Sequence, residues 1–185
     1  MANSLGAASQ GTRNYLALIS FIAALGGFLF GFDTAVVSGT LEYLRDQYQL
    51  NEFMEGVVVA TALVGCMVGA LIAGSLSDRF GRKVMLIVSA ILFVAGAIGT
   101  AVPPNVDLLI LARWVGGVGV GVASMLAPMY LSEVSPPQVR GRLIALYQLA
   151  ITIGVVVAYF SNVLLQWLST DAWAGLPVGF WRWVL

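Results

Sequence analysis

The sequence of 185 residues contains no histidine, one cysteine and few charged side chains. Without histidine, the chain lacks the commonest metal ligand and the commonest general base of proteins. Cys66 has no partner for an internal disulfide bond, because it is the single cysteine. Charged residues make up 10% of the sequence, against about 25% in a typical soluble domain. The nine basic and nine acidic residues cancel, which argues against nucleic acid as a partner.

Hydrophobic residues make up 59% of the sequence and are arranged in long runs. Five stretches carry almost no charge, and each is at least about as long as the 18–20 residues that cross a bilayer as a helix. The sequence therefore predicts an all-α integral membrane protein that contacts the lipid bilayer. Transmembrane helices are predicted at about 15–43, 54–77, 84–103, 107–131 and 142–168, with the start of a sixth from residue 181 onward.

Basic residues cluster at alternate ends of the predicted helices. They lie before the first helix, between the second and third helices, and between the fourth and fifth. These residues are Arg13, Arg79, Arg82, Lys83, Arg140 and Arg142. The opposite loops hold only Arg45 and Arg182. Because short loops rich in lysine and arginine stay in the cytoplasm, the N-terminus is predicted to be cytoplasmic. Residues 1–14 would then form a short cytoplasmic tail.

Pairs of glycines four residues apart recur in three of the predicted helices. They are Gly27 with Gly31, Gly65 with Gly69, and Gly117 with Gly121. Small residues on one helix face let backbones approach closely in lipid, where no hydrophobic effect drives helices together. The pattern predicts a tightly packed bundle and does not identify a ligand.

Asp33 and Arg113 are charged residues within predicted helices. A charge near the bilayer centre costs roughly 3 kcal/mol or more on insertion scales, so it requires a partner. A helical rise of about 1.5 Å per residue puts Asp33 roughly 12 Å and Arg113 roughly 9 Å below the outer boundary. Their similar depth predicts that each is the counter-ion of the other.

Two interpretations of this pair are open. A static ion pair would only fix the bundle. A titrating pair would do more, because a nearby arginine holds a carboxylate charged and an apolar environment favours its neutral form. A structural change that altered their separation would then change the proton affinity of Asp33 and couple proton movement to that change.

Four groups of motifs resemble those of the sugar-porter branch of the major facilitator superfamily. Residues 74–83 are similar to the superfamily's signature loop between helices 2 and 3. Residues 115–121, 128–133 and 140–142 resemble the sugar-porter signature in residue type and spacing. Residues 28–39 resemble the first helix of bacterial proton-linked sugar symporters, xylose/proton symporters in particular, and residues 147–154 resemble the family's helix 5. The likeness extends from about Tyr15 to Leu185.

The resemblance implies roles for matching residues. Asp33 would be the proton-coupling carboxylate, with Arg113 as its partner. Passive glucose facilitators of the family commonly have asparagine at the Asp33 position, so aspartate favours symport. Gln148 would hydrogen-bond sugar hydroxyls, with Ile151 and Phe30 packing against the sugar ring.

Two details of the expected sugar site remain open. Symporters often carry a second glutamine one turn after the Ile151 position, where this chain has Val155, which leaves the preferred sugar undetermined. The depth estimate also puts Gln148 nearer the cytoplasmic side than Asp33. A start of helix 5 before Leu143 would reduce this difference in depth.

The resemblance also implies an inner gate, in which salt bridges at the cytoplasmic helix ends hold the outward-facing state. The residues expected in it are Asp78, Arg79, Gly81, Arg82, Glu133, Arg140 and Arg142. A simpler interpretation is that these charges set the topology and form exposed pairs, each worth only about 0–1 kcal/mol.

Transporters of this superfamily have two six-helix halves, with the substrate held between them. Residues 15–185 are therefore predicted to be an incomplete N-terminal half, without the C-terminal half. A truncated product or fragment is expected, which would be inactive alone. A natural half-transporter that pairs with a complementary chain is the alternative.

The preferred function is sugar/proton symport by alternating access in a cell membrane, either the inner or the plasma membrane. The alternatives are facilitated diffusion of a sugar or a polyol such as inositol, and a sugar sensor or assembly partner that does not transport. An enzyme is not predicted, because no nucleophile–base or metal constellation is present in the sequence. No cofactor is expected, and the proton would be the coupling ion.

Overall fold

The computed structural model describes residues 2–101 and 103–171, all of which lie in helices or short connections. The helices are α1 (Ala2–Tyr48), α2 (Glu52–Phe80), α3 (Arg82–Ala101), α4 (Val106–Val134) and α5 (Pro137–Asp171). Each contains a segment long and apolar enough to cross a membrane. The prediction of five transmembrane helices is confirmed, while the predicted start of a sixth lies outside the described residues.

The helices extend beyond the predicted apolar segments, because apolar length locates the membrane rather than the ends of a helix. α2 and α4 begin where the side chains of Asn51 and Asn105 accept hydrogen bonds from the backbone N–H groups of Met54 and Leu108. α5 begins at Pro137, which suits a first helical position because proline has no N–H to satisfy there.

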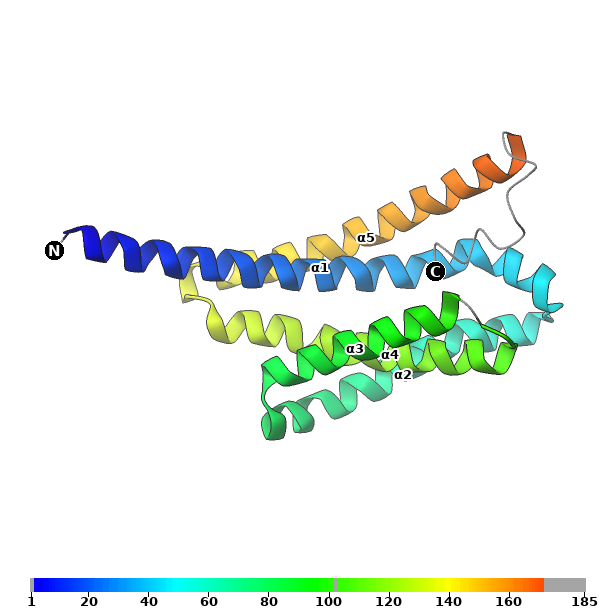
Figure 1. The fold of residues 1–185 in the computed structure, drawn as a ribbon, viewed down its shortest axis with the longest axis horizontal. Coiled ribbons are helices and arrows are strands. Elements are labelled where there is room, and N and C mark those ends of the chain that lie inside the picture. Colours follow the sequence, from blue (N-terminus) through cyan, green and yellow to red (C-terminus); the bar gives the residue numbers. More distant parts are fainter. Residues whose placement is uncertain (1, 102, 172–185) are drawn as a thin grey trace.

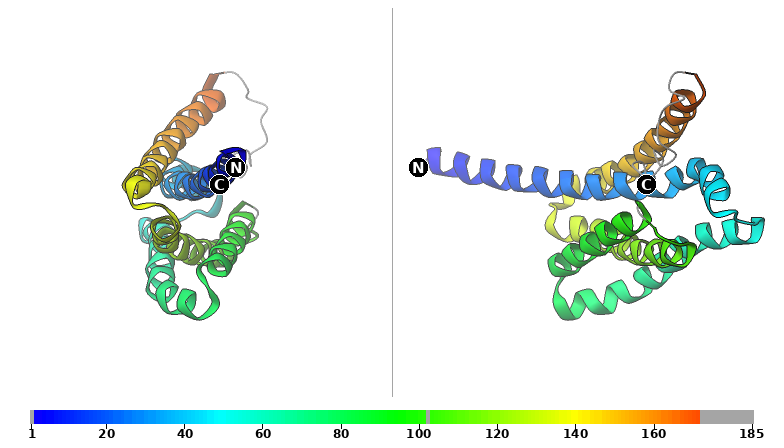
Figure 2. Two further views of the ribbon diagram at one scale, coloured as in Figure 1. Left: turned by 90° about the vertical axis from the view of Figure 1, so that its left-hand side faces the viewer. Right: turned by 45° about the vertical axis from the view of Figure 1, so that its right-hand side comes forward.

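Two packed groups of helices form the bundle (Figures 1 and 2). α1 and α5 lie side by side, and α4 lies between α2 and α3 in the second group. The contacts between the groups are fewer and involve mainly α1 and α4. α1 also continues beyond the rest of the bundle at its N-terminal end (Figure 1).

Glycines bring α1 and α5 into backbone contact. A Cβ on Gly31 would lie 2.0 Å from the carbonyl oxygen of Ile151, and one on Gly154 would lie 2.1 Å from that of Phe28. Any larger residue would force these helices apart. The predicted tight packing of the first helix thus has a specific partner, which is α5.

Glycines also bring α4 into contact with both of its neighbours. A Cβ on Gly121 would lie 2.1 Å from the carbonyl oxygen of Cys66 in α2. On the side of α4 that faces α3, a Cβ on Gly96 would lie 2.5 Å from Cα of Gly116. α4 therefore joins α2 and α3 into one closely packed group.

Candidate functional site

Asp33 and Arg113 form an ion pair between α1 and α4. Nη1 of Arg113 donates to Oδ1 of Asp33 at 3.1 Å. The Arg113 side chain is only 7% exposed, whereas that of Asp33 is 25% exposed. Nε of Arg113 is buried without a hydrogen-bond partner among the described residues. The guanidinium therefore depends on Asp33 as its counter-ion.

Both residues lie well within the segments that can span a membrane, Leu16–Leu41 and Val106–Val134. The structure thus brings together the two charges whose similar depth was predicted from helical rise. The geometry establishes the pairing, and the role of Asp33 in proton coupling stays a prediction.

Gln148 lies on an exposed part of α5, nearer than Asp33 to the N-terminal end of its helix. Gly27 packs against Tyr147 and Gly31 packs against Ile151, so α1 and α5 run in parallel. These contacts put Gln148 level with a part of α1 that lies several residues N-terminal to Asp33. α5 does begin before Leu143, but the offset between the expected sugar ligand and the carboxylate remains.

The other two residues of the expected sugar site are partly buried. Ile151 packs against Gly31 and against a cluster that includes Leu131 and Tyr147. Phe30 is partly buried on α1, and its carbonyl oxygen accepts a hydrogen bond from Thr34. Ile151 thus has a packing role in the bundle, whatever else it contacts.

Sequence reasoning missed two residues that share an exposed side of α5 with Gln148. Thr152 and Tyr159 are both exposed and follow Gln148 by one turn and three turns. Thr152 follows Ile151, whose backbone contacts Gly31 of α1. Helical spacing from Gln148 is the signal that could have identified them, and the hydroxyl of Thr152 donates to the carbonyl oxygen of Gln148 at 3.2 Å.

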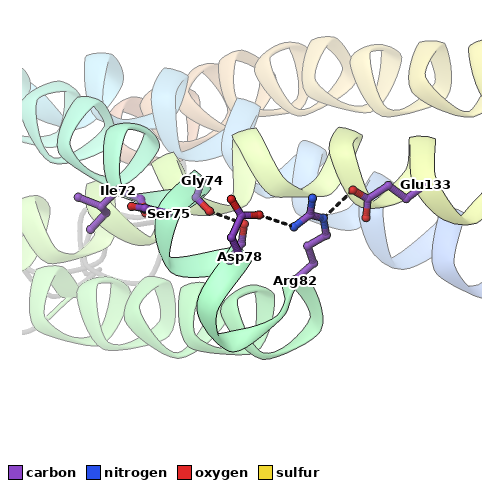
Figure 3. A network of polar contacts seen from close by, with 7 residues as sticks. Ile72, Gly74, Ser75, Asp78, Arg82 and Glu133 are labelled. Carbon is purple, nitrogen blue, oxygen red and sulfur yellow. Dashed lines mark hydrogen bonds and ion pairs between the residues drawn. The ribbon is translucent and has the colours of Figure 1, made fainter.

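Arg82 is the centre of a charge cluster near the turn between α2 and α3 (Figure 3). Its Nε donates to Oε1 of Glu133 at 2.7 Å, and its Nη1 donates to Oδ1 of Asp78 at 3.1 Å. Because Asp78 is on α2 and Glu133 is on α4, one guanidinium ties the start of α3 to two other helices. The structure brings these three of the predicted gate residues together.

The remaining predicted gate residues do not join this cluster. Arg79 lies over the ring of Phe80, with 5.5 Å between its Cζ atom and the ring centroid. Arg140 and Arg142 are exposed, and no ion pair involves them among the residues described. Gly81 has a φ of +88° in the turn after α2, a backbone conformation that favours glycine.

Two contacts tie α1 to the rest of the bundle at the opposite end. Arg45 forms an ion pair with Glu55 on α2. The hydroxyl of Tyr48 donates to the carbonyl oxygen of Pro103 at 2.8 Å. Over the described part of the chain, no three His, Cys, Asp or Glu residues gather in a way that could hold a metal ion.

Several curated relatives of the chain are described as transporters of sugars. The chain is 46% identical to an arabinose–proton symporter of Bacillus subtilis, over 94% of its own length and 37% of the relative's. It is 44% identical to a galactose–proton symporter of Escherichia coli, over 90% of this chain and 34% of the relative. It is 42% identical to a glucose transport protein of Synechocystis, over 98% of this chain and 40% of the relative. The chain thus spans well under half the length of these relatives.

Solved structures of a proton:xylose symporter, XylE, have the same fold. The structure with a bound bromodeoxyglucose matches with a TM-score of 0.83 at 35% identity, over 94% of this chain and 42% of that one. A partially occluded, inward-open structure from E. coli matches with a TM-score of 0.81 at 35% identity, over 92% and 44%. A sequence model of the family described as "Sugar (and other) transporter" matches residues 19–184. The chain corresponds to the N-terminal portion of such a transporter. It is a multi-pass membrane protein that belongs to the sugar-porter family of the major facilitator superfamily.

Proposed function

We propose that these residues belong to a transporter that couples the entry of a sugar to the entry of a proton by alternating access. The observation that carries the proposal is the Asp33–Arg113 ion pair within the membrane span. A carboxylate at that depth is costly unless it is paired or has a task. The arabinose and galactose symporters related to this chain support the proton as the coupling ion.

The chemistry of the pair suits reversible proton binding. The ion pair with Arg113 requires a charged carboxylate, so a proton bound at Asp33 removes the pair. Proton binding at Asp33 and the contact between α1 and α4 are therefore linked. Asp33 is also 25% exposed, which leaves a route for a proton. No further cofactor is needed for this step.

Gln148, with Ile151 and Phe30, is proposed to form the part of the sugar site that this chain supplies. An amide both donates and accepts hydrogen bonds, which suits sugar hydroxyls. The rest of the site would come from a C-terminal half or a complementary chain, because substrates of this fold bind between two halves. The Asp78–Arg82–Glu133 cluster would act as the inner gate, extended by Arg79, Gly81, Arg140 and Arg142.

The protein is proposed to lie in the inner or plasma membrane with a cytoplasmic N-terminus. The cluster around Arg82 and the exposed Arg140 and Arg142 lie at the helix ends that the positive-inside rule assigns to the cytoplasm. The side chain of Arg13 is outside the described set, and its position in the sequence supports the same orientation.

Proton flux during sugar uptake tests the function. The complete reading frame that contains these residues would be expressed in cells lacking other sugar uptake systems, and the external pH would be recorded on addition of arabinose, galactose, xylose or glucose. We expect alkalinisation with at least one sugar. Asp33→Asn should abolish accumulation and alkalinisation but keep sugar exchange, because a neutral side chain at this position cannot release a proton.

Asp107→Asn is the matched control, because Asp107 is an exposed acid at the start of α4. It should leave uptake and proton flux unchanged. Sugar uptake by the unmodified protein without alkalinisation would reject symport and favour facilitated diffusion. Uptake of inositol in place of the sugars would change the substrate, and binding without flux in sealed vesicles would favour a sensor.

A further inference from the structure

A row of polar residues follows one face of α5 toward its C-terminal end. Gln148, Thr152, Tyr159 and Asn162 are separated by four, seven and three residues, which is the spacing of neighbours on one helix face. The first three side chains are exposed, and Asn162 is partly buried. Large apolar side chains are exposed on another face of the helix, at Leu149, Ile153, Val156 and Phe160. Because polar groups are costly in lipid, the polar row is expected to face water or another part of the transporter.

The C-terminal end of this row meets a second polar row on α1. Thr34 and Ser38 are exposed and lie one turn apart. The hydroxyl of Ser38 donates to the carbonyl oxygen of Ala35 at 2.6 Å, and Nδ2 of Asn162 donates to the same oxygen at 3.5 Å. Ser38 and Asn162 therefore converge from two helices on one carbonyl group. Thr34, Ser38, Tyr159 and Asn162 are called the outer cluster, because the proposed orientation puts the C-terminal ends of α1 and α5 outside.

We propose that the outer cluster is a second sugar-binding position, at which a neutral sugar docks before it moves inward to Gln148. The proposal rests on the transport function proposed above and adds a place on the route of the substrate. Tyr159 follows Gln148 by eleven residues, which is roughly 16 Å along the axis of α5 by helical rise. The two positions are therefore separate, and Thr152 lies between them.

Hydrogen-bond acceptors dominate the outer cluster. The hydroxyls of Thr34 and Ser38 each donate to a carbonyl oxygen of their own helix, so their lone pairs stay free to accept from a ligand. The middle of α5, residues 143–170, has no charged residue. The carboxylate of Asp33 on α1 is already paired with Arg113. Free acceptors without a free charge fit a neutral ligand that carries many hydroxyl groups.

Tyr159 and Asn162 add an aromatic ring and an amide to these hydroxyls. Tyr159 is 57% exposed, so its ring offers an apolar surface beside polar groups, a combination that is typical of ligand sites. Oδ1 of Asn162 is buried without a hydrogen-bond partner among the described residues. An unsatisfied buried acceptor costs about 1–3 kcal/mol. The side chain of Asn162 therefore gains a partner when it turns toward a ligand hydroxyl.

Protection of a cysteine from chemical labelling tests the proposal on the protein expressed from its complete reading frame. Ser38→Cys, in a background free of other cysteines with Cys66→Ala, would be treated with a membrane-impermeant maleimide outside intact cells. The reaction rate would be measured with and without arabinose, galactose, xylose or glucose. We expect at least one sugar to slow the reaction, whereas glycine betaine, which has no hydroxyl group, should not. Thr34→Cys is a second reporter in case Ser38→Cys folds poorly.

Three further variants separate the outer cluster from the inner position. Protection of Ser38→Cys should persist in Gln148→Ala, because the rest of the outer cluster is intact. Tyr159→Leu should raise the sugar concentration that gives half protection about tenfold, the equivalent of about 1.4 kcal/mol of binding. Phe160→Leu is the matched control, because Phe160 is exposed on the apolar face of α5, and it should leave that concentration unchanged.

Loss of protection in Gln148→Ala would overturn the proposal, because the sugar would then act on the reporter only through the inner position. Equal effects of Tyr159→Leu and Phe160→Leu would overturn it as well, as would a sugar that is taken up but protects neither reporter. Failure of both cysteines to react from outside would have the same consequence, since a docking position must be open to the medium. Labelling requires no proton flux, so failure here and failure of symport are separate results.

Discussion

At the scale of single residues, glycine decides which helices touch. Gly26 and Gly31 are both on α1, but they differ completely in surroundings. A Cβ on Gly31 would collide with the backbone of Ile151, whereas a Cβ on Gly26 would meet nothing within 4 Å. The cost of a single added methyl group therefore depends on the tertiary neighbour and not on the helix that carries it.

Gly31→Ala should destabilise the protein by about 1–3 kcal/mol, because α1 and α5 must separate to admit the methyl group. The free energy of unfolding would be measured by titration with a denaturing detergent. Gly26→Ala is the matched control and should be neutral or stabilising by up to about 1 kcal/mol, since alanine favours helix more than glycine does. Equal losses in both variants would contradict the close α1–α5 contact.

At the scale of elements, Arg82 links three helices through one side chain. It ties the start of α3 to Asp78 of α2 and to Glu133 of α4. The cluster is open to solvent, as Asp78 is 73% exposed, so each pair adds little to stability. Weak pairs of this kind suit the proposed inner gate, because conformational states that interconvert can differ by only a few kcal/mol.

Arg82→Gln should lower the initial rate of sugar uptake about tenfold, which corresponds to about 1.4 kcal/mol in the balance of states. The free energy of unfolding should fall by less than about 1 kcal/mol per lost pair. Uptake rates and detergent titrations would be measured in parallel.

Lys83→Gln is the matched control, because Lys83 is exposed and forms no ion pair among the residues described. It should change neither the rate of sugar uptake nor the free energy of unfolding. A loss of uptake fully matched by a loss of stability would assign Arg82 a structural role only. Equal effects at both positions would point to general charge rather than to the cluster.

At the scale of the whole molecule, all five helices are long and apolar enough to cross the membrane, and their basic ends predict the orientation. Short turns connect the helices, so one exposed position in each turn reports the side on which that turn lies. Pro104 precedes α4, and Gln138 lies at the start of α5. Both are exposed in the structure, which makes them suitable for labelling.

Pro104→Cys should react with a membrane-impermeant maleimide in intact cells, while Gln138→Cys should react only after lysis. The expectation follows from the excess of basic residues near Gln138. The labelling would be measured by gel shift in a Cys66→Ala background. The reverse pattern would place the N-terminus outside and would require the proposed inner gate to be reassigned to the other face.

The sequence alone determined the membrane class, the five spans and the family, because apolar length and local motifs are properties of contiguous residues. It also predicted the Asp33–Arg113 pairing, since depth in a bilayer can be counted along a helix. It did not predict that Arg82 joins Asp78 and Glu133 while Arg140 and Arg142 stay apart, nor how far Gln148 lies from Asp33. Those features depend on how helices are rotated and shifted against each other. In apolar helices that rotation leaves little trace in hydrophobic periodicity, and only the tertiary structure showed which glycine faces meet.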